Sequence, residues 1–218
     1  MRFVILLISL ISSSVSAGVI WKYPWQQKRI STCFTKAETK IRDIGVLRTH
    51  IHNWTPDEKE TLQRLLAQEY SLKRTGIEFT GFENCDDDPK ADIVLFKARN
   101  GGLLGGQASV GPKRKGFLEG YPLARGYVLL YDLNLTNITH EFGHVLGLQH
   151  EHLHPEAFDE DPGCLRRILN KPAKVSEHYI YTPYNRNSVM NYCHTSAPGG
   201  DQIGLDQEDI RNLRSIYP

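Results

Sequence analysis

Three histidines within one short segment constrain this chain more than any other feature. The segment has the pattern H-E-x-x-H-x-x-G-x-x-H, with its histidines at His140, His144 and His150. On a helix, His140 and His144 are four residues apart, so both imidazoles leave the same face and can share one ion. Gly147 can adopt the left-handed conformation that ends a helix, which lets His150 approach that ion from a third direction.

The glutamate of this pattern has a different expected role. Glu141 lies about 100° around the helix from His140, which keeps its carboxylate off the metal but beside a water at an open position. Three neutral imidazoles with one open position are the ligand set of a catalytic zinc ion. We therefore expect one Zn²⁺ ion held by His140, His144 and His150, with Glu141 as the catalytic general base. Histidines that only cap or pack a helix are the alternative, and the length of the pattern disfavours it.

A second motif further along the chain identifies a family likeness. Residues 188–192 have the pattern S-x-M-x-Y, and the third histidine begins the sequence H-E-H-x-H-P. With the histidine segment, these motifs resemble the metzincin metallopeptidases and, within them, the astacins. The resemblance covers about residues 93–192 and, more loosely, residues 18–218. It implies a zinc metalloendopeptidase in which Met190 forms a hydrophobic floor below the imidazoles and Tyr192, a second catalytic residue, stabilises the oxyanion.

Two positions depart from the astacin pattern. His154 stands where astacins usually carry arginine, and Asn191 stands where they usually carry histidine. With histidine in place of arginine at position 154, the local salt bridges of the family are not expected to form in the same way. Neither position is a zinc ligand. The resemblance also implies that Glu151 is structural and contacts the mature N-terminus. We expect His152 and His154 to lie near the site without binding the metal.

The expected fold class is α+β. The resemblance implies the metzincin zinc-peptidase fold, with a twisted mixed sheet, a backing helix, an active-site helix and an irregular C-terminal subdomain that ends in a helix. Residues 55–58 form a capping box with proline in the first turn, and the apolar spacing that follows predicts a helix that ends at Gly76. We expect strands near residues 77–80, 91–96 and 126–131, the zinc helix at about 137–148, and a last helix from its cap at Asp206 to Tyr217.

The segment Ala108-Ser109-Val110-Gly111 is similar to the rim strand of the family, beside which an extended protein or peptide substrate binds. Strand addition supplies main-chain hydrogen bonds and little side-chain selectivity. Three basic residues follow, at positions 113–115. Such a run is most often a solvated loop, and the alternative is a basic patch beside the cleft that prefers acidic substrate residues.

The start of the chain predicts export. Arg2, the apolar run 3–11 and the small residues Val15-Ser16-Ala17 match a cleaved signal peptide, residues 1–17. The apolar run is too short to span a bilayer, although an N-terminal anchor is the alternative. Residues 18–218 then form a single catalytic domain with its cleft between about 18–147 and 148–218. We expect a secreted or periplasmic protein.

The cysteine count agrees with export. Four cysteines in an exported chain suggest two disulfides, for which three pairings exist. We favour Cys33–Cys85 and Cys164–Cys193, because each pair stays on its own side of the zinc helix. A cysteine zinc cluster is disfavoured because the spacing is wide.

The charge of the chain is nearly balanced, with 26 basic and 25 acidic residues. No bulk field would draw it to nucleic acid or anionic lipid, so we expect no nucleic-acid partner. Beyond the predicted signal no run is long and apolar enough to be a membrane span, and we expect a monomer. The function predicted is an exported zinc-dependent metalloendopeptidase. The alternatives are a non-catalytic zinc-binding module of the same fold and a proteolytic effector directed at a host.

Overall fold

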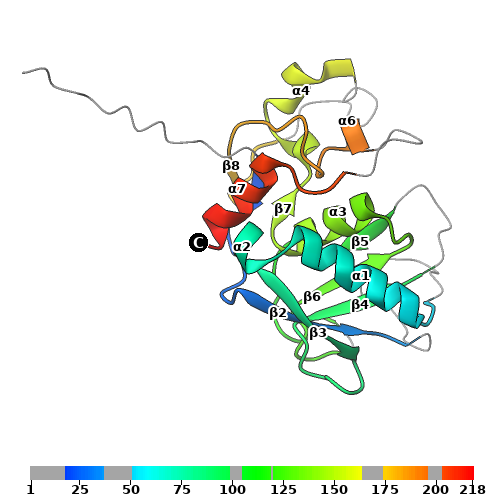
Figure 1. The fold of residues 1–218 in the computed structure, drawn as a ribbon. Helices are drawn as coiled ribbons and strands as arrows, with labels where there is room; N and C mark the ends of the chain where they lie inside the picture. Colours follow the sequence, from blue (N-terminus) through cyan, green and yellow to red (C-terminus); the bar gives the residue numbers. More distant parts are fainter. Residues whose placement is uncertain (1–17, 37–50, 99–104, 119, 164–173, 196–202) are drawn as a thin grey trace, which may run out of the picture.

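The computed structural model describes residues 18–36, 51–98, 105–118, 120–163, 174–195 and 203–218, and within these it contains two sheets (Figure 1). The larger sheet has the strand order β3-β2-β4-β6-β5. Strands β2, β3, β4 and β6 are parallel, and β5 is antiparallel at one edge. The bounds are β2 (Arg29–Phe34), β3 (Glu78–Asn84), β4 (Ile93–Lys97), β5 (Gly106–Ala108) and β6 (Gly126–Leu130). The expected mixed sheet of an α+β fold is confirmed.

Both faces of this sheet are covered, as a largely parallel sheet requires. In β4, Ile93 and Leu95 pack in the same core as the helices α1 (Pro56–Glu69) and α3 (Leu135–Val145). Val94 and Phe96 point to the other face and pack in a second cluster with loop residues. The alternation of side chains along the strand produces this division, and it explains why β4 is apolar almost throughout.

The first helix begins as expected and ends earlier. Thr55 and Glu58 form the predicted capping box of α1. The prediction that this helix continues to Gly76 is wrong, because α1 ends at Glu69 and a short helix α2 (Leu72–Thr75) follows. The side chain of Ser71 accepts a hydrogen bond from the amide of Arg74 and starts this new turn. Gly76, with φ 80°, ends α2 instead.

The zinc helix α3 also differs from its expected range. It begins at Leu135, two residues earlier than expected, and ends at Val145, three residues earlier. Gly147 has φ 102° and turns the chain, as its position in the motif predicts. The next residues form β7 (Leu148–Gln149), which pairs with β1 (Val19–Trp21) in a small antiparallel sheet of order β7-β1-β8, where β8 is Tyr179–Tyr181.

The C-terminal part is irregular and ends in the expected helix. It contains the 3₁₀ turn η1 (Glu151–Leu153) and the helices α4 (Ala157–Glu160), α6 (Tyr192–Thr195) and α7 (Gln207–Ile216). Asp206 caps α7, and Asp209 completes a capping box. No helix in the described ranges is both long enough and apolar enough to cross a membrane.

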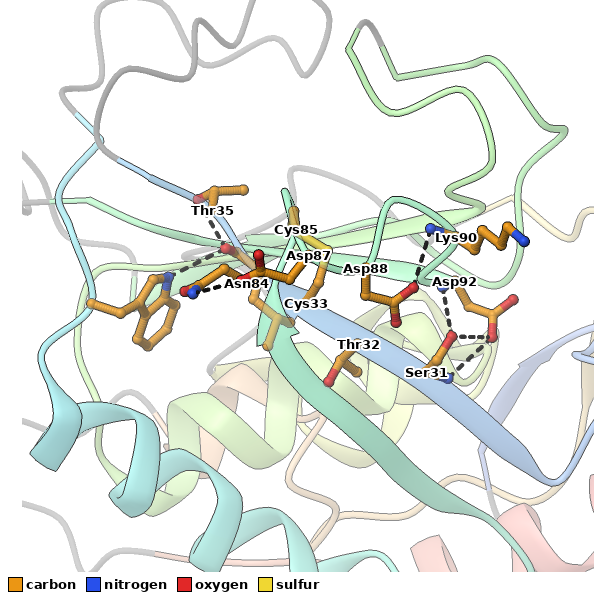
Figure 2. Close-up of a disulfide and its surroundings, with 12 residues drawn as sticks. Ser31, Thr32, Cys33, Thr35, Asn84, Cys85, Asp87, Asp88, Lys90 and Asp92 are labelled. Atoms are coloured by element: carbon orange, nitrogen blue, oxygen red, sulfur yellow. Dashed lines mark hydrogen bonds between the residues drawn. A yellow bond between two sulfur atoms is a disulfide. The ribbon is translucent and has the colours of Figure 1, made fainter.

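One predicted disulfide joins the ends of neighbouring strands. Cys33 of β2 and Cys85, directly after β3, are bonded, with 4.8 Å between their Cα atoms (Figure 2). The pairing Cys33–Cys85 is therefore confirmed. The other predicted pairing includes Cys164, which lies outside the described residues, as does the predicted signal at residues 1–17. The pairing Cys164–Cys193 and the signal peptide therefore stay predictions.

Candidate metal and catalytic site

The three histidines of the motif converge on one point. His140 and His144 lie on α3, and His150 follows β7 after the turn at Gly147. The Nε2 atom of His150 lies 3.2 Å from Nε2 of His140 and 2.9 Å from Nε2 of His144. Among the described residues, this triad is the group whose donor atoms are placed to hold a metal ion.

Backbone carbonyl groups orient two of these rings. Nδ1 of His140 donates a hydrogen bond to the carbonyl of Val189, and Nδ1 of His144 donates to the carbonyl of Leu148, each at 2.9 Å. A carbonyl only accepts, so each Nδ1 carries the proton and each Nε2 presents its lone pair toward His150. Lone pairs gathered so closely fit a cation, and a three-imidazole set fits zinc.

Burial keeps these imidazoles neutral. It lowers the pKa of His140 to about 4. Burial and then the neighbouring charge of His140 lower the pKa of His144 to about 3. The pKa of His150 is lowered for the same reasons, with burial again the main cause. Neutral imidazole is the form that binds a metal ion, so the ligands need lose no proton at neutral pH.

Glu141 has the features of a poised base. Its side chain is 6% exposed, and its Oε2 atom has no hydrogen-bond partner in the described part of the chain. Burial raises the pKa of this carboxyl to about 8. A buried carboxylate without a hydrogen-bond partner lowers the stability of the folded protein. Such destabilising groups are typical of sites where the side chain acts on a substrate or on water. Strand β5 passes close above it, since a Cβ at Gly106 would lie 2.7 Å from Cγ of Glu141.

Tyr192 packs against the metal-binding rings. Its ring is stacked on His140, with centroids 5.3 Å apart, and lies 4.4 Å from the ring of His150. Burial and then the charge of Glu141 raise the pKa of its phenol to about 12. The phenol is therefore protonated at neutral pH and can donate a hydrogen bond at the site.

Residues 188–192, here called the methionine turn, pack against α3 beside the metal-binding histidines. Met190 is buried, and a Cβ at Gly143 of α3 would lie 2.8 Å from its sulfur atom, so glycine lets the turn pack closely. The amide of Glu151 donates to the carbonyl of Met190 at 3.1 Å. This turn therefore packs against the zinc helix and is bonded to the residue that follows the third histidine.

A carboxylate on α7, which the sequence did not single out as part of the site, holds this turn. Asp209 accepts hydrogen bonds from the hydroxyl of Ser188 at 2.6 Å and from the amide of Val189 at 3.1 Å. The carbonyl of Val189 in turn orients His140. Burial and then the charge of Asp206 raise the pKa of Asp209 to about 7, although these hydrogen bonds favour its charged form. The sequence indicated only Asp206 as the cap of this helix, a local feature that does not predict a contact between Asp209 and residues 188–189.

The two departures from the astacin pattern both have partners. His154 is buried, and its Nε2 atom is hydrogen-bonded to the carbonyl of Thr182. The amide group of Asn191 donates to the hydroxyl of Tyr184 at 2.7 Å and to the carbonyl of Arg186 at 3.0 Å. Both side chains are therefore held in place by hydrogen bonds to neighbouring segments.

The remaining predicted neighbours also lie near the triad. His152 is buried, and its ring is stacked on His150 with centroids 4.8 Å apart. Glu151 is buried and accepts a hydrogen bond from the amide of Asn185 at 3.2 Å. A Cβ at Gly18 would lie 2.9 Å from Oε1 of Glu151, so this carboxyl faces the beginning of the predicted mature chain.

Comparisons with known proteins agree with this geometry. No family model matches the chain. The zinc metalloproteinase nas-3 of Caenorhabditis elegans is 30% identical over 89 residues, which are 41% of this chain and 30% of that protein. The chain therefore spans less than a third of the length of this curated relative.

A solved structure extends the likeness to nearly the whole chain. High choriolytic enzyme 1, a hatching enzyme zinc-protease from the medaka fish Oryzias latipes, superposes with a TM-score of 0.53 at 17% identity. The match covers 91% of this chain and 94% of the other. At this identity the likeness is one of fold. Together the two comparisons confirm the expected resemblance to astacin-type zinc metallopeptidases and the expected fold.

Proposed function

We propose that this astacin-like chain is an exported zinc-dependent metalloendopeptidase. The observation that carries the proposal is the convergence of three Nε2 atoms beside an unpaired buried carboxylate one residue after the first histidine. A metal-binding module without catalysis has no need to bury an unpaired Glu141 at this place. The likeness of sequence and fold to two zinc proteases supports the same conclusion.

Each site residue has a separate task in this mechanism. His140, His144 and His150 would hold one zinc ion, which when bound acidifies a water molecule and polarises the scissile carbonyl. Glu141 takes the proton of the attacking water on its carboxylate and passes it to the leaving amine. The phenol of Tyr192 donates a hydrogen bond to the oxygen that gains charge as the peptide bond is attacked.

The substrate would be a protein or peptide in extended form. Strand β5 lies at the edge of the large sheet, and within the described residues it pairs with β6 alone, so its other edge can accept an added strand. A peptide on that edge would lie beside Glu141, because β5 passes over this side chain at Gly106. We propose that the mature enzyme is the single domain 18–218 and acts as a monomer.

Export is part of the proposal. The disulfide Cys33–Cys85 is typical of proteins in an oxidising compartment, which is where the predicted signal would direct the chain. Both features support a secreted or periplasmic location.

The test is digestion of a peptide library, derived from a proteome, with purified residues 18–218. N-terminal sequencing of the products should reveal new peptide termini, and o-phenanthroline should abolish their formation. A protein that contains zinc but generates no termini from the library or from casein would instead be the non-catalytic module.

A further inference from the structure

The rim of the large sheet continues past β5 toward a basic residue. After β5, the amide of Ser109 donates to the carbonyl of Tyr127 at 3.1 Å, and the amide of Lys113 donates to the carbonyl of Arg125 at 2.6 Å. Between them the chain bends at Gly111, which has φ 61°. The segment 106–113, here called the rim segment, therefore runs from Glu141 at one end to Lys113 at the other.

The bend of the rim segment rests on an aromatic residue. The amide of Gly111 donates to the carbonyl of His144 at 2.9 Å, and a Cβ at Gly111 would lie 2.5 Å from Cδ1 of Trp21. Only glycine combines the left-handed backbone with this close approach. The geometry fixes the rim segment both to the end of the zinc helix and to the Trp21 side chain.

Lys113 differs from the two basic residues that follow it. Arg114 and Lys115 are exposed, as a solvated loop would have them. Lys113 is half-buried, and its ammonium lies over the ring of Trp21, 5.6 Å from the centroid. In the described part of the chain it forms no ion pair. Burial lowers its pKa, which means that the charge has lost water without gaining a carboxylate partner.

A series of side-chain contacts links the ring below Lys113 to the metal site. The ring of Trp21 packs edge-on against the ring of Tyr179, with centroids 5.4 Å apart. The hydroxyl of Tyr179 accepts a hydrogen bond from the side chain of Gln149 at 3.1 Å. Gln149 immediately precedes the expected ligand His150 and accepts a hydrogen bond from its amide at 3.0 Å. A peptide that follows the rim segment away from Glu141 therefore reaches these rings and the Lys113 ammonium together.

We propose that Lys113, Trp21 and Tyr179 form a substrate subsite that selects an acidic side chain on the N-terminal side of the cleaved bond. The proposal rests on the proposed peptidase function. Antiparallel pairs are the commoner kind, and a peptide added antiparallel to β5 has its N-terminal residues toward Lys113. An extended peptide rises about 3.3 Å per residue, as the rim segment itself does where it is a strand. A peptide that follows the rim segment from Glu141 to Lys113 therefore brings to Lys113 a residue up to roughly six positions before the cleaved bond. A carboxylate there pairs with a partly desolvated ammonium, and the rings hold its apolar stem.

The experiment compares the cleavage preferences of three zinc-loaded proteins on the same proteome-derived peptide library: residues 18–218 of the wild type, Lys113→Glu and Lys115→Glu. The wild type should enrich Asp and Glu about tenfold at one position N-terminal to the cut. Lys113→Glu should lose this enrichment and favour Lys or Arg there. Lys115→Glu has the same change of charge two residues away, without the ring contact, and should keep the wild-type preference.

A second measurement uses one pair of peptides that differ only by Glu or Gln at the enriched position. The wild type should show about a tenfold higher kcat/KM for the Glu peptide, and Lys113→Glu should not. Cleavage by the wild type with no acidic preference, an acidic preference on the C-terminal side, or equal losses in both lysine variants would overturn the subsite. Absence of any cleavage by the zinc-loaded wild type would overturn the peptidase function, and the subsite with it.

Discussion

Replacement of Asp209 by alanine tests how the metal site is held in place. This carboxylate contacts the methionine turn and α7 but none of the three histidines. It accepts hydrogen bonds from Ser188, Val189 and Asp206 in a buried place. Hydrogen bonds to a charged group contribute about 1.5–3 kcal/mol each and do not add fully. We therefore expect Asp209→Ala to lower the free energy of unfolding by roughly 3–5 kcal/mol, from the loss of this buried network.

The same change should weaken zinc binding. Without Asp209 the amide of Val189 is released, and the Val189 carbonyl then no longer fixes the ring of His140. Loss of a group that orients a ligand typically lowers metal affinity by about 10- to 100-fold. Zinc affinity would be measured by competition with a chelator at pH 8, and the melting temperature of the metal-free protein should fall by roughly 10 °C.

The matched control is Ile210→Ala. Ile210 is the next residue on α7 and packs partly buried against the core, so its truncation also destabilises the helix. We expect this variant to melt earlier while its zinc affinity stays within about twofold of the wild type. If Asp209→Ala bound zinc as tightly as Ile210→Ala, the proposed support of His140 through the turn would be refuted.

Three further outcomes follow from the geometry. His144→Ala should lose zinc from the purified protein, as measured by atomic absorption, whereas retention of a full equivalent would remove His144 from the ligand set. Tyr192→Phe should lower kcat by on the order of 10- to 1,000-fold with little change in KM, and an effect on KM alone would place this ring in substrate binding. Replacement of Cys33 and Cys85 by alanine should lower the free energy of urea unfolding by about 4 kcal/mol, since the bridge spans 52 residues; an unchanged midpoint would contradict this.

Local patterns predicted the parts of this site that depend on spacing along the chain. The four-residue interval between His140 and His144 places both rings on one helical face, and Gly147 provides the turn that the third histidine needs. The capping box at Thr55 and the cap at Asp206 likewise mark helix starts from neighbouring residues alone. These features are set by helix geometry and backbone sterics, which act within a few residues.

The parts that escaped prediction depend on distant contacts. The zinc helix ends early because Leu148 and Gln149 pair with β1, more than 120 residues away in the chain. The contact of Asp209 with Val189 and the position of Lys113 over Trp21 likewise join remote segments. Two-residue strands and single carboxylates carry no periodic signal, so only the packed fold identifies them.

The rate and metal content of Glu141→Gln test the central claim most directly. The amide is isosteric with the carboxylate but cannot accept the proton of the attacking water, and the three histidines are untouched. Purified Glu141→Gln should contain about one zinc ion per chain, like the wild type, while kcat/KM for a cleaved peptide falls by several orders of magnitude. A variant that retains zinc and cleaves at nearly the wild-type rate would contradict the assignment of Glu141 as the base, and with it the mechanism proposed for this chain.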